Sequence, residues 1–243
     1  AFGSPHLRFM PRDLFIAATP RSGSELLCQW FLRSYLYGWT GEWFAFGTIA
    51  GDAAHLGVPV ETRLRPLLEA LRREKAADDG RVSIKMMWPV FDAFREQEGA
   101  SLLSFLRTPE CIWVRRRDKV AQAVSLYKAE QTDKWRSETG AQEDVPYSGA
   151  DIARCLHRIR AEEAAWESFF SVLGPQPQVI VYEDFAPRQR EAFRELLERL
   201  DLPAVPEDRI QAPPTIRKQG TANNEALGGR FRADRPELGL TDG

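Results

Sequence analysis

The stretch LFIAATPRSGSE, residues Leu14–Glu25, decides the fold of this chain. Leu14 to Thr19 is an apolar run of strand length, and the turn-forming residues from Pro20 to Ser24 interrupt it before a helical pattern begins. A strand, a tight turn and a helix N-terminus direct backbone N–H groups and the positive end of the helix dipole to one point. This arrangement predicts an anion-binding turn.

The side chains of this turn suit a phosphate-like ligand. Gly23 permits close approach, Ser22 and Ser24 offer hydroxyl groups, and Arg21 offers a charge-assisted contact. The stretch lacks the Gly-Lys pair of a Walker A loop, so the usual grip on a magnesium-bound nucleotide is missing. Taken alone, the motif is equally compatible with an ordinary strand-to-helix turn that binds nothing.

The composition is that of an ordinary globular chain. Its 243 residues suit one domain, and the net charge of −2 gives no general reason to expect nucleic acid as a partner. No apolar run approaches the ~18 residues that span a bilayer, so no membrane span is expected. Cys28, Cys111 and Cys155 form neither a metal-binding spacing nor a disulfide framework, which favours a cytoplasmic location.

Apolar segments alternate with helical patterns along the rest of the chain. Strands are expected at 14–19, 82–87, 111–114 and 179–182, and helices at about 26–37, 60–77, 90–97, 119–131, 151–173 and 184–200. Asp151 and Asp184 are the expected N-caps of the last two helices, and the tail after Pro203 is expected to be mostly loop. The alternation predicts an α/β fold with a parallel sheet flanked by helices.

Basic residues end or follow several of these strands. Arg21, Lys85 and Arg115–Arg117 should share the edge where the strands end, which is where such sheets bind ligands. Ser125 lies a little over two turns into the helix that follows the three arginines. Two separate basic sites predict a ligand with two separated phosphates. Read singly, the arginines also fit a solvated turn, and Lys85 fits a strand-end lysine that reaches solvent.

The order of these segments resembles that of PAPS-dependent sulfotransferases, and more closely that of the bacterial family typified by trehalose 2-sulfotransferase. The matching segments are TPRSGSELL (19–27), GEWF (41–44), IKMMW (84–88), RRDKVAQAVS (116–125), QTDKW (131–135), VYEDF (181–185) and RKQG (217–220). The resemblance implies a P-loop-NTPase-like sulfotransferase fold over residues 14–232, between an irregular N-terminus (1–13) and a flexible tail (233–243). It implies 3′-phosphoadenosine 5′-phosphosulfate (PAPS) as the donor, with no metal.

The resemblance also implies which residues hold the donor. The 5′-phosphosulfate would lie on the turn formed by Arg21, Ser22, Gly23, Ser24 and Glu25. The 3′-phosphate would be held by Ser125 together with Arg116 or Arg117. The C-terminal loop that closes over the donor would contribute Arg217, Lys218 and Gln219.

The general base is expected in the loop after the first helix. Animal cytosolic sulfotransferases carry a histidine at a K-T-H strand end, where this chain has Lys85-Met86-Met87, and methionine cannot accept a proton. The trehalose-type family uses a glutamate, and its match is Glu42. Arg21 and Lys85 are then expected to stabilise the transferring sulfuryl group. The residues expected to contact the acceptor are Glu42, Trp43, Phe44, Trp88 and Trp135.

The sequence and this resemblance together predict an enzyme that moves a sulfuryl group from PAPS to a hydroxyl group of a carbohydrate or another small polar acceptor. One alternative is a catalytically silent nucleotide- or glycan-binding module on the same scaffold. Another is a P-loop-type phosphotransferase, which the missing Gly-Lys-Ser/Thr loop disfavours. Dimerisation occurs in the family, so a homodimer is a further expectation, and the loops at 45–60 and 132–149 do not identify the acceptor.

Overall fold

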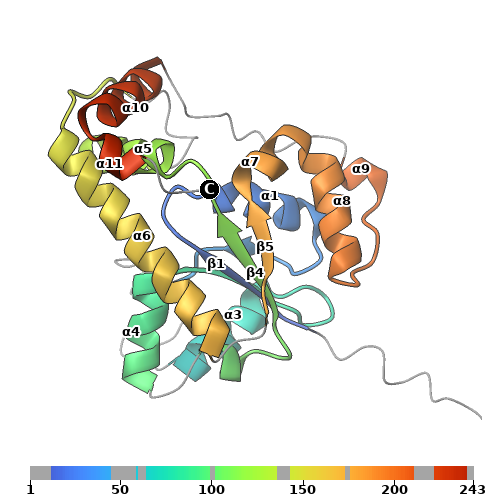
Figure 1. Cartoon of the computed structure of the whole chain (residues 1–243). Helices are drawn as coiled ribbons and strands as arrows, with labels where there is room; N and C mark the ends of the chain where they lie inside the picture. Colours follow the sequence, from blue (N-terminus) through green and yellow to red (C-terminus); the bar gives the residue numbers. More distant parts are fainter. Residues whose placement is uncertain are drawn as a thin grey trace, which may run out of the picture.

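A computed structural model describes residues 12–44, 59, 64–98, 102–135, 143–172, 176–210 and 222–239 of the chain. Five parallel strands form one sheet in the order β2-β3-β1-β4-β5, which confirms the predicted α/β class. Figure 1 shows β1, β4 and β5 of this sheet among the helices. The strands are β1 (Leu14–Ala18), β2 (Thr40–Gly41), β3 (Ser83–Met87), β4 (Glu110–Arg115) and β5 (Gln178–Val181). The central position of β1 places the turn that follows it in the middle of the carboxyl edge.

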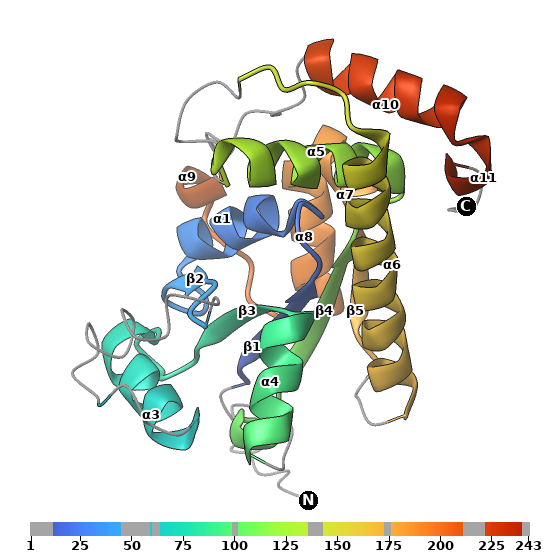
Figure 2. The ribbon, with the colours of Figure 1, turned by 90° about the vertical axis from the view of Figure 1, so that its left-hand side faces the viewer.

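Helices cover both faces of this sheet (Figure 2). They are α1 (Ser24–Ser34), α3 (Leu64–Lys75), α4 (Trp88–Glu98), α5 (Lys119–Thr132), α6 (Gly149–Val172), α7 (Tyr182–Phe185), α8 (Gln189–Arg199), α9 (Glu207–Ile210), α10 (Ala222–Asp234) and α11 (Pro236–Gly239). Single 3₁₀ turns lie at Leu102–Phe105 and Ala186–Arg188. No described helix combines the length and the apolar character needed to cross a membrane.

Strand β1 is buried along its whole length because both of its faces carry helices. On one face Phe15 packs against Phe91 of α4 and Trp166 of α6, with ring centroids 5.6 and 5.8 Å apart. On the other face Leu14 and Ile16 join a cluster that includes the side chains of α1 and α8. The strand that leads into the anion-binding turn is therefore held from both sides.

Both predicted N-caps are wrong. Helix α6 begins two residues before Asp151, and the hydroxyl group of Ser148 accepts a hydrogen bond from the Asp151 backbone (3.3 Å) while it donates one to the Asp151 carboxylate (2.6 Å). The expected helix at 184–200 is divided into α7, a 3₁₀ turn and α8, since Pro187 has no N–H to continue the α-helical pattern. Asp184 makes no cap and bonds to Arg117 instead.

The tail after Pro203 is more helical than its composition indicates. Helix α10 contains two adjacent glycines, which disfavour helices, and is nevertheless 13 residues long. Its Leu227 and Phe231 are buried one turn apart, in a cluster that includes residues of α5 and α6. Packing of this apolar pair outweighs the local cost of the glycines. Helix α11 follows, within the segment expected to be a flexible tail.

Asp13 ties together the amino edge of the sheet, opposite the predicted ligand edge. Its fully buried carboxylate accepts two hydrogen bonds from Arg72 of α3, at 2.9 and 2.8 Å. It also accepts backbone N–H bonds from Val82 (3.1 Å) and Arg107 (2.8 Å), which precede β3 and β4. One side chain thus connects the three central strands to a covering helix.

Replacement of Asp13 by asparagine should lower the free energy of unfolding by about 3–5 kcal/mol, because it leaves the Arg72 charge without its buried partner. Urea denaturation followed by circular dichroism measures this loss. Asp92→Asn is the matched control, because the pair between Asp92 and Arg95 is solvent-accessible and should be worth less than about 1 kcal/mol. Similar losses for both variants would contradict the role assigned to Asp13.

Candidate active site

The backbone after β1 turns through two left-handed residues. Arg21 has φ 62° and Gly23 has φ 89°, and Gly23 is the N-cap of α1, with no side-chain hydrogen bond to cap the helix. A Cβ atom on Gly23 would lie 2.2 Å from the ring of Tyr182. The sequence predicts a glycine that admits a ligand. On the Cβ side of Gly23 the closest neighbour is the aromatic ring at the start of α7, and contact of this glycine with a ligand stays a prediction.

Helix α5 contacts this turn through Gln122, a residue that is not among the predicted site residues. Gln122 is fully buried, and its amide nitrogen donates hydrogen bonds to Thr19 Oγ1 (2.9 Å) and to the Pro20 carbonyl oxygen (2.7 Å). Its one available signal in the sequence is the three-residue spacing from Ser125, which places both residues on the same side of a helix. Gln122 therefore fixes the turn to the helix that carries the second predicted anion site.

Arg21 joins the two predicted anion sites directly. Its Nε donates to Ser125 Oγ at 2.9 Å, and its Nη1 donates to the Trp135 carbonyl oxygen at 2.5 Å. The turn and the helix flank are therefore adjacent in space.

Arg116 lies beside Arg21 and contacts it. Its Nη1 donates to the Arg21 carbonyl oxygen at 3.5 Å, and its guanidinium group lies over the ring of Tyr182, 5.1 Å from the centroid. Burial, and then the positive charge of Arg116, lower the pKa of Arg21 to about 10. Two guanidinium groups that destabilise each other would both be stabilised by an anion placed near them.

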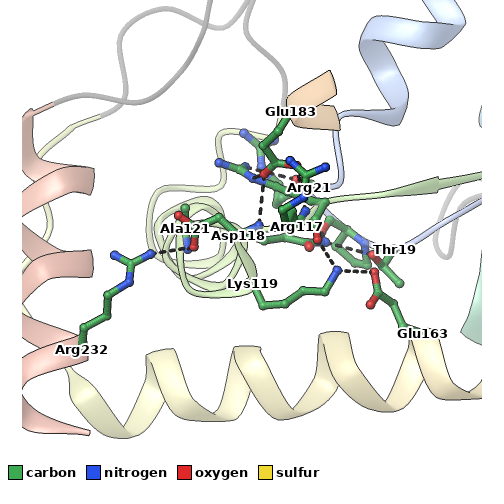
Figure 3. Close-up of polar contacts among 12 residues, drawn as sticks. Thr19, Arg21, Arg117, Asp118, Lys119, Ala121, Glu163, Glu183 and Arg232 are labelled. Carbon is green, nitrogen blue, oxygen red and sulfur yellow. Dashed lines mark hydrogen bonds and ion pairs between the residues drawn. The ribbon is translucent and has the colours of Figure 1, made fainter. Parts of the chain in front are cut away.

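The other two arginines of the triplet point elsewhere. Arg117 is exposed and binds Asp184 at 2.7 and 3.0 Å, while Arg115 lies 3.4 Å from Glu163. Glu183 fixes the segment between β4 and α5, because its carboxylate accepts the backbone N–H groups of Arg117 (2.8 Å) and Asp118 (3.1 Å). Figure 3 shows Glu183 directed at this segment, near Arg21.

Lys85, the middle residue of β3, forms the centre of a second cluster. Its buried ammonium group lies 3.0 Å from Glu25 Oε2, on the first turn of α1, and 3.2 Å from Glu42 Oε2, just after β2. Burial alone would lower the pKa of Lys85, but the neighbouring Cys28, Glu25 and Glu42 raise it above its ordinary value. Glu25, Glu42 and Lys85, which come from three separate motifs, thus form one ion-pair cluster in which the lysine is charged.

The four aromatic residues expected at the acceptor differ in their surroundings. Phe44 is buried and packs edge-on against Phe94, with centroids 5.5 Å apart, and Trp88 packs edge-on against Trp166 at 5.0 Å. Trp43 lies near the ammonium group of Lys75. Trp135 is exposed. Contact between these residues and an acceptor stays a prediction.

Some of the expected site lies outside the described residues. This applies to Arg217, Lys218 and Gln219 and to most of the loop at 45–60. Within the described part of the chain, no group of three or more His, Cys, Asp or Glu side chains is placed to hold a metal ion.

The arrangement of an arginine-lined turn at the centre of a parallel sheet agrees with a family comparison. The model of the Stf0 sulphotransferase family matches residues 14–234. The chain belongs to this family. It is 27% identical to the trehalose 2-sulfotransferase of Mycobacterium tuberculosis, over 94% of this chain and 97% of that protein. It is 28% identical to the Mycolicibacterium smegmatis trehalose 2-sulfotransferase, over 60% of this chain and 55% of that protein.

The fold of this Stf0 sulphotransferase is similar to that of a solved mammalian structure. A mouse sulfotransferase complexed with PAP superimposes with a TM-score of 0.52 and 12% sequence identity, covering 93% of this chain and 82% of the mouse chain. The sulfotransferase fold expected from the sequence is thereby confirmed.

Gly23→Ala should lower the free energy of unfolding by about 2–5 kcal/mol, since the added methyl group meets both a left-handed backbone and the Tyr182 ring. Thermal and urea denaturation measure the loss. Tyr182→Ala in the Gly23→Ala background should recover the part due to the clash, while the backbone strain remains.

The control for this substitution is Gly229→Ala in the helical part of α10, where nothing lies within 4 Å of an added Cβ atom. That change should stabilise the protein by about 0.5–1 kcal/mol. A Gly23→Ala variant as stable as Gly229→Ala would show that the turn is not constrained as described.

Proposed function

We propose that this Stf0 sulphotransferase transfers a sulfuryl group from PAPS to a hydroxyl group of a small polar acceptor, with a sugar as the favoured class. The observation that carries the proposal is the contact of a carboxylate, Glu42, with a buried ammonium group, Lys85, at the strand edge that also carries the arginine-lined turn. The similarity over nearly the full chain to a trehalose 2-sulfotransferase supports a carbohydrate acceptor.

The residues around the turn fit the donor. Ser22 Oγ is buried and has no hydrogen-bond partner among the described residues, so this group is available to an anion. Arg116 Nε also makes no hydrogen bond among the described residues, and it lies 3.7 Å from Glu183 Oε1 in an ion pair. We assign the turn from Arg21 to Glu25 to the 5′-phosphosulfate. We assign Ser125 with Arg116, in preference to Arg117, to the 3′-phosphate, because Arg116 is the arginine that contacts the turn while Arg117 binds Asp184. Closure over the donor is assigned to Arg217, Lys218 and Gln219.

The chemistry assigned to the chain is proton removal and charge stabilisation. PAPS supplies the sulfuryl group. Glu42 takes the proton of the acceptor hydroxyl group while the acceptor oxygen bonds to sulfur and the bond from sulfur to the phosphate oxygen breaks. Lys85 and Arg21 stabilise the negative charge on the sulfuryl and leaving oxygens, as fixed charges do in phosphoryl transfer. The proton thus goes to Glu42, the sulfuryl group goes to the acceptor and PAP leaves, so the reaction needs no redox partner.

We assign the acceptor to the neighbourhood of Glu42. We propose that Trp43 and Trp135 contact it. Phe44 and Trp88, which pack in the core, would hold the surrounding backbone in place.

Binding of adenosine 3′,5′-bisphosphate (PAP) in the presence of EDTA should stabilise the protein by about 2.7 kcal/mol at a ligand concentration of 100 Kd. A thermal shift assay measures this, with ATP and Mg²⁺ as the comparison. Arg116→Ala should reduce the shift more than Arg117→Ala does. An equal or larger response to ATP and Mg²⁺ would favour the phosphotransferase instead.

Glu42→Gln should lower kcat for sulfation about 10²- to 10⁴-fold and leave PAP binding intact, because the amide cannot accept the proton. PAPS-dependent sulfation of a panel of sugars, followed by mass spectrometry, measures the rate. Glu69→Gln, on the exposed face of α3, is the matched control. Unchanged sulfation by Glu42→Gln would exclude Glu42 as the base, and a wild-type protein that binds PAP but sulfates nothing would favour the silent binding module.

A further inference from the structure

Lys85 contacts the carboxylates of Glu25 and Glu42, and the proposed reaction uses only that of Glu42. Glu25 Oε2 lies 3.0 Å from the ammonium nitrogen, closer than Glu42 Oε2 at 3.2 Å. The side chain of Glu25 is 48% exposed, that of Glu42 27% and that of Lys85 only 5%. The lysine is thus fixed inside the protein while Glu25 reaches it from the solvent side.

Glu25 has a second anchor that does not depend on Lys85. Its Oε1 accepts a hydrogen bond from Gln29 Nε2 at 3.0 Å, one turn further along α1. The two carboxylate oxygens therefore have different partners, one on strand β3 and one on their own helix. The Glu25 side chain can keep its bond to Gln29 when Lys85 takes another partner.

The charges around Lys85 disfavour an incoming anion. Glu25 and Glu42 together carry two negative charges against the single positive charge of Lys85. Glu25 also lies in the first turn of α1, where the unpaired N–H groups and the helix dipole attract negative charge. A carboxylate in this position occupies the electrostatic environment that the proposed function assigns to the charged end of the donor.

We propose that Glu25 is an internal counter-ion, which pairs with Lys85 in the donor-free protein and yields the ammonium group to the negatively charged 5′ end that PAPS and PAP share. This inference rests on the proposed function. The backbone N–H of Glu25 still belongs to the donor-binding turn, but its carboxylate competes with the donor. Glu25 is a positioning residue that sets donor affinity, and proton transfer belongs to Glu42.

Glu25→Gln tests this, because the amide keeps the length of the side chain and its oxygen can still accept from Lys85, while the negative charge and the acceptor for Gln29 Nε2 are removed. Titration of the full chain with PAP at low ionic strength should show an affinity about three- to tenfold higher than that of the wild type. The gain should shrink in high salt, which screens the repulsion. The KM for PAPS should fall by a similar factor, and kcat should change much less.

Two further variants make the result specific. Glu195→Gln changes the net charge equally on the exposed side of α8, where Glu195 pairs with Arg188, and should leave PAP affinity unchanged. Glu25→Ala should also bind PAP more tightly, which separates the loss of charge from any property of the new amide. A merely structural role for Glu25 predicts weaker binding in both Glu25 variants, since damage to the helix start would disturb the turn.

The outcomes separate this inference from the proposed function. Unchanged or weaker PAP binding by a folded Glu25→Gln protein overturns the inference and leaves the proposed function standing. Loss of sulfation with PAP binding intact would transfer the role of base to Glu25 and also overturn it. A wild-type protein that does not bind PAP would overturn the proposed function itself, and the inference with it.

Discussion

The backbone path between Ala18 and Ser24 is the constraint on which the carboxyl edge of this protein depends. A residue with a side chain in the left-handed region, as at Arg21, costs about 1–2 kcal/mol and persists only where its surroundings enforce it. Here the surroundings come from three helices. Gln122 of α5 holds the start of the turn, Trp166 of α6 donates to the Ala18 carbonyl oxygen at 3.1 Å, and the ring of Tyr182 in α7 packs beside Gly23.

The distribution of carboxylates decides which basic side chains remain directed at this turn. Glu163 binds Lys119 at 2.7 Å and also lies near Arg115, as Figure 3 illustrates for Lys119, and Asp184 holds Arg117 on the outside. Arg21 and Arg116 are brought together despite their like charges. Glu163 and Asp184 therefore fix the neighbouring cations away from the turn, while Arg116, whose Nε lies 3.7 Å from Glu183 Oε1, stays beside Arg21.

The sequence predicts the features that follow from local pattern. Strands β1, β3, β4 and β5 are recognisable as short apolar runs, and parallel topology then brings the Lys85 side chain close to the turn after β1. Strand β2 has only two residues and no pattern of its own, so it depends on pairing with β3. The contacts of Gln122, Glu183 and Asp184 join segments that are distant in the sequence, so local propensity carries no information about them. Helix α10 is missed for the same reason: its glycines predict a loop, and its two buried apolar residues stabilise the helix only through contacts with residues far along the chain.

The packing of α10 has a consequence for biosynthesis. Arg232 of α10 bonds to Asp118 at the start of α5 (2.6 Å), and Asn224 accepts a hydrogen bond from Lys128 of α5 (3.1 Å). On the ribosome, the helix that carries Ser125 is made roughly a hundred residues before the helix that covers it, at a translation rate of about 5–20 residues per second. For several seconds the nascent chain therefore exposes the part of α5 that α10 covers in the finished protein.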